Sequence, residues 1–307
     1  MRVVVAGLGV QGQKRRAVAG AEVAATVDPF HADARFKHVA DVPLGSYDAA
    51  LLCIPDEPKI EVIEYLLSHG KHLLVEKPLF AKDPADLERL KALAAQKRAV
   101  CYTAYNHRFE PHFVRMKALL EFGRLGQVYS LRMFYGNGTA RLVRDSAWRD
   151  QGAGVLPDLG SHLLDTILFW LGRPSAPFRL HSANCFENRA PDHVAFGAAG
   201  TPRLQMEMTL LSWRNHFNAD IFAEKGSAHI ESLCKWGPST FTVRERKLPS
   251  GRPDEESVTL VQPDPTWAAE YEHFKRLCER GESNIDNDIW INDTLADLTR
   301  QVLGSTA

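Results

Sequence analysis

Apolar and polar positions divide the chain into two differently patterned parts. Up to about residue 105, short β-branched runs alternate with stretches whose apolar residues recur at helical spacing. This alternation predicts parallel strands joined by crossover helices, which is typical of a doubly wound α/β domain. The predicted strands are 3–6, 22–27, 49–54, 73–76 and 100–104, and the clearest predicted helix is 84–97.

After a helix predicted at 111–122, strands follow one another with turn residues between them, which favours an antiparallel sheet. Helices are predicted at 159–171, 266–280 and 289–303, and an exposed loop at 249–255. The second part is therefore an α+β domain with a large, mostly antiparallel sheet. Its predicted strands are 128–135, 179–186, 203–211, 217–223, 228–231, 241–246 and 257–261.

The length of 307 residues corresponds to two domains of about 150 residues each. We place a dinucleotide-binding Rossmann domain at 1–105 and a substrate-binding and oligomerisation domain at 106–307. The C-terminal helix belongs to the second domain in this division, with packing on the Rossmann domain as an open alternative.

Composition excludes several classes of protein. With 37 Lys and Arg against 38 Asp and Glu, the formal net charge is −1, so no overall field attracts nucleic acid. The apolar stretch 163–171 is far shorter than the roughly 20 residues of a membrane span, and no charged and apolar leader precedes the first strand. Five widely spaced cysteines without a CxxC pair indicate reduced thiols. We expect a soluble, cytoplasmic protein without a metal site.

A glycine-rich motif, Gly7-Leu8-Gly9-Val10-Gln11-Gly12, directly follows the first predicted strand and opens a helix. Such glycines permit a tight turn, approach of backbone amides to a pyrophosphate, and close packing of the helix on the sheet. Asp28 ends the second strand, where a carboxylate can accept hydrogen bonds from the adenosine ribose. The motif predicts a dinucleotide site; the alternative is a turn that serves packing alone.

Two further segments carry candidate chemistry. Lys77, in Glu76-Lys77-Pro78, follows a strand at the sheet edge where ligands bind, and can stabilise a developing negative oxygen. Asp158 and His162 are four residues apart at a helix start, so that the carboxylate can support the imidazole as a proton acceptor. The alternatives are a surface lysine, and an N-cap aspartate beside an ordinary helix histidine. Asp165 is either a helix-face acid or a substrate contact.

These segments together resemble one known family. The ordered set GLGVQG, VEKPL at 75–79, YNHRF at 105–109 and GAGVLPDLGSHLLD at 152–165 is similar to the Gfo/Idh/MocA oxidoreductases. The resemblance implies a Rossmann domain, reversible hydride transfer between a nicotinamide cofactor and a secondary hydroxyl of a sugar or polyol, and catalytic roles for Lys77, Asp158 and His162. It also implies a cis Lys77-Pro78 bond.

The chain departs from the family pattern at two places. The family often has Asn and, three residues later, His after the proline at 55, whereas this chain reads Pro55-Asp56-Glu57-Pro58-Lys59. His107 stands where an arginine is common. The resemblance also admits an NAD-retaining glycosidase that oxidises its substrate transiently, and a non-catalytic sensor of small ligands.

The expected cofactor is NAD rather than NADP, because Asp28 would repel a 2′-phosphate, although Arg35 could reach back toward one. The expected partner is a small sugar or polyol substrate, with self-association as a homodimer or homotetramer through the C-terminal sheet. Arginines preceding the Asp158 helix suggest that the substrate carries an anionic group; solvated loop charges are the alternative. The predicted cofactor contacts are Gly7, Gly9, Val10, Gln11, Gly12, Asp28, Pro55, Glu76 and Lys77, and the predicted substrate contacts are Lys77, Arg108, Arg141, Arg144, Trp148, Asp158 and His162.

Overall fold

The chain forms two compact units, each built from two separate segments. A computed structural model describes residues 1–146 and 149–305. The first unit contains Met1–Asn106 and Pro265–Asp293, and the second contains His107–Asp264 and the residues from Thr294 onward. The sequence analysis placed 265–293 in the second domain, whereas these residues pack within the first unit.

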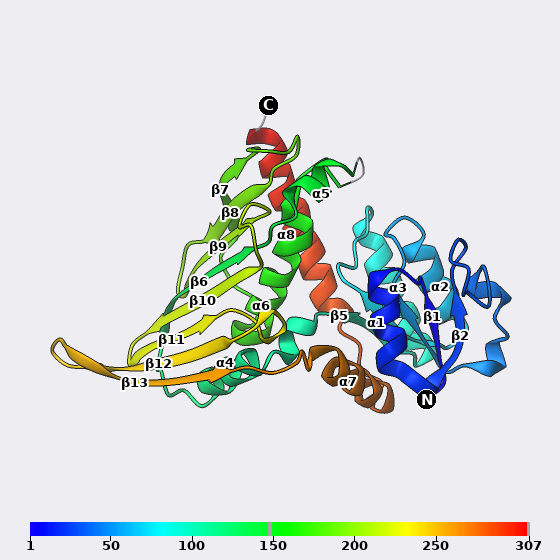
Figure 1. Ribbon diagram of the computed structural model, residues 1–307, viewed down its shortest axis with the longest axis horizontal. Coiled ribbons are helices and arrows are strands. Elements are labelled where there is room, and N and C mark those ends of the chain that lie inside the picture. Colours follow the sequence, from blue (N-terminus) through cyan, green and yellow to red (C-terminus); the bar gives the residue numbers. More distant parts are fainter. Residues whose placement is uncertain (147–148, 306–307) are drawn as a thin grey trace. The chain divides into compact units, whose positions relative to one another are not determined.

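The first unit is a parallel sheet with the strand order β2-β1-β3-β4-β5 (Figure 1). The chain runs from β1 outward to the edge strand β2 and then continues on the other side of β1 with β3, so the order reverses between β1 and β3. In open α/β sheets, ligands bind at the carboxyl ends of the strands beside such a reversal. The strands are β1 Val3–Ala6, β2 Val23–Val27, β3 Ala49–Leu52, β4 His72–Glu76 and β5 Cys101–Ala104.

Helices cover both faces of this sheet. Residues alternate along each strand, so that Val4 and Leu52 face a core shared with α2 and α3, while Val3 and Val5 face a core that includes Phe274 of α7. Because successive side chains point to opposite faces and both faces are covered, most positions of these strands are apolar and the sequence shows continuous apolar runs. The helices of this unit are α1 Val10–Ala19, α2 Lys59–Ser68, α3 Pro84–Lys97, α7 Thr266–Arg280 and the first part of α8 Ile285–Ser305.

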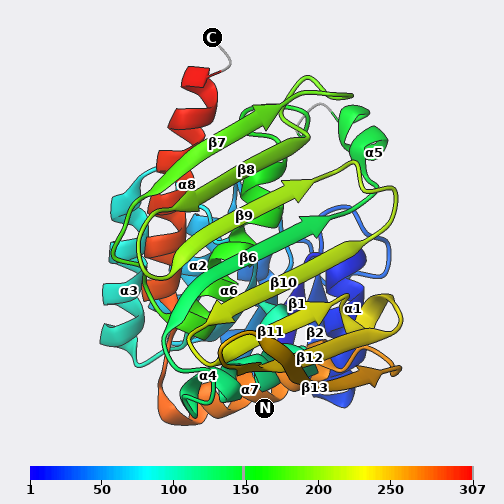
Figure 2. The same ribbon diagram turned by 90° about the vertical axis from the view of Figure 1, so that its left-hand side faces the viewer.

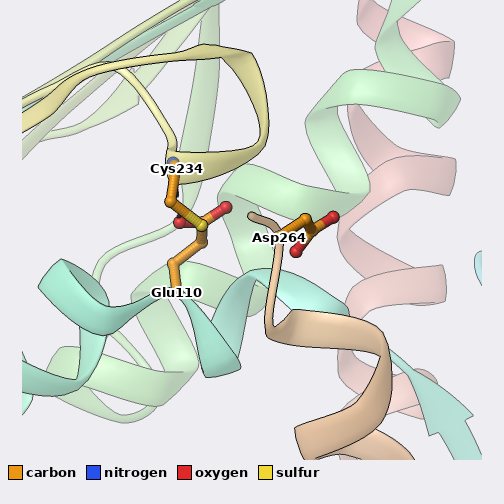
Figure 3. A group of neighbouring side chains, drawn as sticks. All are labelled: Glu110, Cys234 and Asp264. Carbon is orange, nitrogen blue, oxygen red and sulfur yellow. Dashed lines mark hydrogen bonds between the residues drawn. The ribbon is translucent and has the colours of Figure 1, made fainter. Parts of the chain in front are cut away.

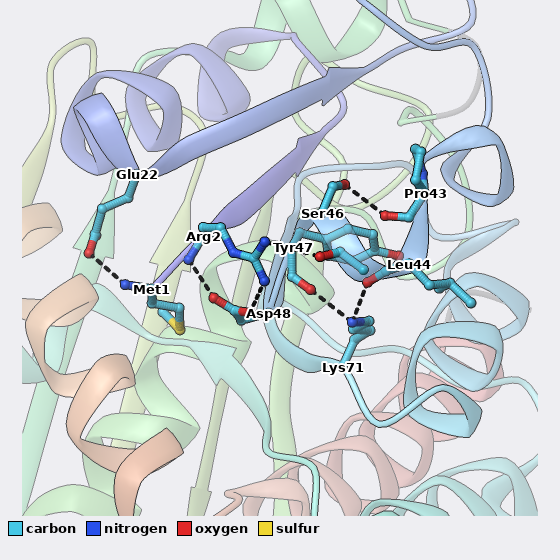
Figure 4. A network of polar contacts seen from close by, with 10 residues as sticks. Met1, Arg2, Glu22, Pro43, Leu44, Ser46, Tyr47, Asp48 and Lys71 are labelled. Atoms are coloured by element: carbon cyan, nitrogen blue, oxygen red, sulfur yellow. Dashed lines mark hydrogen bonds and ion pairs between the residues drawn. The ribbon is translucent and has the colours of Figure 1, made fainter.

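Polar contacts fix the amino-terminal edge of the sheet (Figure 4). The Lys71 ammonium donates to the carbonyl oxygens of Leu44 (2.6 Å) and Tyr47 (2.8 Å). Arg2 binds Asp48 through both its backbone N–H and its guanidinium, each at 2.8 Å. These contacts join the loops before β3 and β4 to the start of β1, which leaves the opposite, carboxyl edge for binding.

A buried arginine joins three elements of the first unit. The Arg15 side chain on α1 is 1% exposed and contacts Glu76 at the end of β4 and Glu270 on α7, each at 2.6 Å. The Trp267 ring lies 4.4 Å from the guanidinium carbon, and the Tyr102 hydroxyl donates to Glu270 (3.3 Å). A buried cation requires such partners, so Arg15 ties the returning helix α7 to the sheet.

The second unit contains an eight-stranded sheet with the order β13-β12-β11-β10-β6-β9-β8-β7 (Figure 2). All neighbours are antiparallel except β6 and β9. Two sequence predictions were wrong: β8 was missed, and most of the predicted loop 249–255 belongs to β13. The strands are β6 Val128–Gly136, β7 Phe178–Asn184, β8 His193–Ala198, β9 Arg203–Thr209, β10 His216–Ala223, β11 Gly226–Glu231, β12 Ser239–Lys247 and β13 Gly251–Leu260.

Helices pack against one face of this sheet (Figures 1 and 2). The indole N–H of Trp170 on α6 donates to the Phe113 carbonyl on α4 (3.1 Å), and the Gln301 side chain of α8 accepts from the Leu180 N–H of β7 (2.8 Å). The helices of this unit are α4 Pro111–Glu121, α5 Ala140–Arg144, α6 Ser161–Leu171 and the remainder of α8. In the described ranges, no helix of the protein has the length and apolar character to cross a membrane.

We expect Glu270→Gln to change how stability depends on pH. Burial raises the pKa of Glu270 to about 7, and the nearby Arg15 only partly offsets this. The pKa of Glu270 in the folded protein lies above that of an unfolded glutamate, about 4.3. Its protonation therefore adds its full contribution to the free energy of unfolding below about pH 4.3, and this contribution is lost as the pH rises through about 7. Glutamine does not titrate, so the unfolding temperature of the variant relative to wild type should rise between about pH 5 and pH 8.

Thermal unfolding at several pH values would test this expectation. Glu279→Gln, at an exposed position of the same helix, is the matched control and should show no such trend. Parallel curves for wild type and Glu270→Gln would contradict the assignment.

Candidate functional site

The glycines after β1 have different steric surroundings. Gly7 has a φ of +86°, and a Cβ there would overlap the Cys53 carbonyl oxygen; a Cβ at Gly12 would overlap the Gly7 carbonyl oxygen. Gly9, the N-cap of α1, has nothing within 4 Å of a Cβ position. Two glycines therefore allow the close packing of the turn, whereas Gly9 keeps open the space in front of the first amides of α1. An open helix N-terminus suits a pyrophosphate, so the turn fits a dinucleotide.

Asp28 braces this turn. Its Oδ2 accepts a hydrogen bond from the Leu8 N–H (2.8 Å), and its Oδ1 accepts from the N–H groups of Phe30 (2.8 Å) and His31 (2.9 Å). Burial raises the pKa of Asp28, but these three amides outweigh burial and hold it below its usual value. A carboxylate offers about four lone-pair sites, so the predicted ribose contact is compatible with this bracing role, which the sequence analysis did not foresee.

The segment after β4 lies at the same carboxyl edge as the glycine turn. Glu76 is turned toward Arg15 (2.6 Å), so its side chain has a structural partner in addition to the predicted cofactor role. Lys77 follows, half-buried, and the Lys77-Pro78 peptide bond is cis, as the resemblance implied. Pro55, Val10 and Gln11 are exposed around the ends of β3 and β1.

A buried lysine that was not predicted as a site residue holds this segment. The Lys59 side chain, at the start of α2, is 3% exposed and pairs with Asp56 at 2.5 Å. Its ammonium also donates to the carbonyl oxygens of Pro78 (3.2 Å) and Glu76 (3.4 Å). The sequence signal for a role of Lys59 was the departure from the family pattern after Pro55, where the family often has Asn and, three residues later, His. Lys59 therefore fixes the backbone on both sides of Lys77.

In the second unit, the segment that carries Asp158 and His162 is held by two glycines. Gly154 has a φ of +56°, and a Cβ there would overlap the Pro191 carbonyl oxygen. A Cβ at Gly160 would lie 3.0 Å from the Leu156 side chain. Leu156–Gly160 forms a π-helical turn that continues into α6 at Ser161, and such wide turns are frequent at functional sites.

The His162 ring packs against two other rings, those of His107 and Tyr135. The residue is 7% exposed, and its ring stacks on that of His107, with centroids 4.0 Å apart and planes 18° apart. The Tyr135 ring meets His162 edge-on at 5.9 Å. Asp158 remains half-exposed and lies 3.8 Å from the Arg149 guanidinium. The His162 imidazole is thus held by one stacked ring and one edge-on ring, while the Asp158 carboxylate four residues earlier is beside the Arg149 guanidinium.

The predicted substrate arginines lie in different environments. Arg108 donates through Nε and Nη2 to the buried carboxylate of Asp165, with the three contacts at 2.6–3.0 Å. Asp165 is therefore the ion-pair partner of Arg108, and this side of the guanidinium is already occupied. Arg141 and Arg144 are exposed on the short helix α5. Trp148 lies outside the described residues.

Glu110, Cys234 and Asp264 form a cluster whose potential ligand atoms lie within 4.8 Å of one another (Figure 3). The Cys234 N–H donates to Glu110 (3.0 Å). Burial, with Glu110 beside it, raises the pKa of the Cys234 thiol, and burial also raises the pKa of Glu110. The cluster is thus joined within the chain by the hydrogen bond from the Cys234 N–H to Glu110.

Comparisons with known proteins agree with this geometry. An inositol 2-dehydrogenase from Saccharopolyspora erythraea is 28% identical over 280 residues, covering 82% of this chain and 78% of that protein. The first curated relatives, uncharacterised oxidoreductases of Schizosaccharomyces pombe, align over only 35 to 36% of their own length.

Solved structures share the fold of the whole chain. A levoglucosan dehydrogenase in complex with NADH has a TM-score of 0.80 at 17% identity, covering 99% of this chain and 96% of that one. A UDP-N-acetylglucosamine 3-dehydrogenase from Acidithiobacillus ferrooxidans has a TM-score of 0.79 at 19% identity, covering 98% and 96%.

Family models match both parts of the chain. Residues 1–105 match an oxidoreductase family with an NAD-binding Rossmann fold, and residues 113–229 match the Gfo/Idh/MocA C-terminal domain. With the glycine turn, the cis Lys77-Pro78 segment and the two sheets in place, the chain belongs to the Gfo/Idh/MocA family of NAD-binding oxidoreductases.

Proposed function

We propose that the protein is an NAD-dependent dehydrogenase that acts on a secondary hydroxyl of a sugar, polyol or sugar derivative. The observation that carries this proposal is the shared sheet edge: Lys77 follows β4 and the glycine turn follows β1, both at carboxyl ends of parallel strands. A lysine fixed at the edge that receives the dinucleotide suits a reacting oxygen next to a nicotinamide.

The side chains then have separate roles. When bound, the nicotinamide supplies hydride transfer, which side chains cannot perform. His162 takes the hydroxyl proton, Lys77 stabilises the developing alkoxide, and Asp158 balances the charge of the imidazolium. In the reducing direction, His162 returns the proton. Support for His162 as the base comes from its buried, ring-packed setting, which restrains the imidazole and excludes water.

Self-association through the large sheet is part of the proposal. Along β10, Phe222 (48% exposed) alternates with the buried Ile221 and Ala223, so its ring lies on the outer face of the sheet. Burial of exposed aromatic rings is a common source of interface energy. This supports a homo-oligomer formed by that face.

Two glycine variants separate cofactor binding from folding. We expect Gly9→Ala to fold normally and to weaken NADH binding by about tenfold or more, about 1.4 kcal/mol, because its methyl group enters the space that the pyrophosphate needs. Gly12→Ala should lower the unfolding temperature, because its Cβ would overlap the Gly7 carbonyl oxygen.

NADH fluorescence titration and thermal unfolding measure the two effects. Gly45→Ala, at a glycine outside the turn that also has nothing within 4 Å of a Cβ position, is the control for both. If Gly9→Ala binds NADH as tightly as Gly45→Ala does, the turn is not the dinucleotide site.

The proposed chemistry predicts that Lys77→Ala and His162→Ala each lower kcat on the order of a hundredfold or more. Both should keep their affinity for NADH, because these groups act on the hydroxyl. The substrate is found by screening sugars, polyols and nucleotide sugars for NADH formation. Lys82→Ala, at a nearby exposed lysine, is the control. Asp158→Asn should lower kcat less than Lys77→Ala or His162→Ala does. Near-wild-type turnover of Lys77→Ala or of His162→Ala would contradict the proposed mechanism.

We expect the preferred substrate to carry an anionic group that Arg141 and Arg144 bind. Both side chains are exposed on α5, and neither forms an ion pair with any residue within the described ranges. Arg141→Ala and Arg144→Ala should lower kcat/KM for phosphorylated or uronic substrates more than for matched neutral ones. Arg203→Ala, at an exposed position of β9, should lower neither. A preference for neutral polyols in wild type would show that α5 has no such role.

A further inference from the structure

We infer that His107 is a positioning residue for His162, held as a neutral imidazole by a hydrogen bond from Lys235. The catalytic consequence rests on the proposed function, whereas the protonation state of His107 can be measured without any activity.

Three separate elements bring the groups together. His107 lies in the 3₁₀ turn Asn106–Phe109, Lys235 lies in the 3₁₀ turn Cys234–Trp236, and His162 lies in the first turn of α6. The two histidine rings are 4.0 Å apart and nearly parallel. The Lys235 ammonium lies 3.1 Å from Nε2 of His107.

The hydrogen bond determines the state of His107. A lysine ammonium has donors only, so Nε2 must accept, and the ring proton is on Nδ1. A second proton on Nε2 would remove the acceptor and place a cation against the ammonium. The Lys235 ammonium lies 4.8 Å from the Trp236 ring centroid, a cation–π contact that helps to hold the charge in place.

Aromatic side chains fix the His107 ring on its other sides. Phe113 meets it edge-on at 5.8 Å, Phe217 edge-on at 6.3 Å, and Tyr135 at 5.5 Å. His107 itself is 1% exposed. A ring packed this closely cannot turn freely, so its plane determines the plane of the stacked His162 ring.

The stack has an electrostatic consequence for His162. Lys235 contacts His107, and Tyr135 packs against both histidine rings. Asp158 and Glu110 act electrostatically on Tyr135, and Cys234 and Asp264 act on Glu110. A neutral ring places no charge against His162, so His107 leaves the imidazolium that His162 becomes accessible when it takes a proton. An arginine at 107 would place a permanent cation in the stack itself, in addition to the Lys235 ammonium beside it.

Nitrogen-15 NMR of the imidazoles in the full chain tests the state of His107 directly, with His107→Phe assigning its signals. At neutral pH we expect one protonated nitrogen, Nδ1, and an unprotonated Nε2. Lys235→Met should shift the Nε2 signal and allow the other tautomer. A doubly protonated His107, an Nε2–H tautomer, or signals unchanged in Lys235→Met would each overturn the inference.

The effect on His162 is read from its own NMR titration. His107→Arg should move the midpoint of His162 to lower pH, because the arginine disfavours the imidazolium. His107→Phe keeps a ring in the stack and should move it much less. His112→Gln is the matched control, since His112 is another buried histidine of this unit that stacks on a phenyl ring, that of Phe241, and it should leave His162 unchanged. An unmoved midpoint in His107→Arg would overturn the electrostatic part.

Activity provides the last arm. With the substrate found by screening, we expect the acid limb of the pH profile of kcat/KM to lie at lower pH in His107→Arg than in wild type. In His107→Phe the acid limb should lie close to that of wild type. If no substrate is found, the proposed function fails while the NMR results still decide the state of His107. If activity is present and the limb does not move, the positioning role fails and the proposed function stands.

Discussion

The first unit depends on the pairing of one buried cation. Arg15 is almost fully enclosed, and a guanidinium does not lose its proton in a protein. It can be buried only if carboxylates meet it, and removal of one partner of a buried pair typically costs about 3–5 kcal/mol. Glu76 is supplied by β4 and Glu270 by α7, which lies more than 190 residues further along the chain. This requirement explains why the polypeptide returns to the first unit.

The same pairing also positions the chemistry. Arg15 holds the Glu76 side chain, while Lys59 holds the carbonyl oxygens of Glu76 and Pro78. Two buried cations thus fix the residue before Lys77 by its side chain and the backbone on both sides of it by hydrogen bonds. Because the segment itself is restrained, the Lys77 ammonium moves only through its own side-chain rotations, and such pre-organisation favours electrostatic stabilisation of a reacting oxygen.

Local patterns were sufficient to predict most elements, because these elements bury one face or both. The helices 84–97 and 266–280 and the strand 3–6 match the structure to the residue. For β13, only the end of the strand was predicted, at 257–261, while its beginning was predicted as a loop. Its residues are nearly all exposed, and it pairs with β12 through charges such as Arg244 with Glu255 and Lys247 with Asp254. A strand that buries no face has no apolar alternation to detect. For β8, small residues such as Ala195 and Gly197 weakened the same signal.

The candidate site shows the same division between local and distant information. The glycine turn is contiguous, so its spacing predicts its geometry. The partners of other residues in the candidate site are not contiguous: Lys235 is 128 residues from His107, and Asp165 is 57 residues from Arg108. Such pairs become visible only when the fold brings them together. The two halves also use different forces: buried ion pairs fix the lysine segment, whereas stacked rings fix the histidine. A base that must gain and lose a proton is better restrained by neutral faces, because these leave both of its charge states accessible.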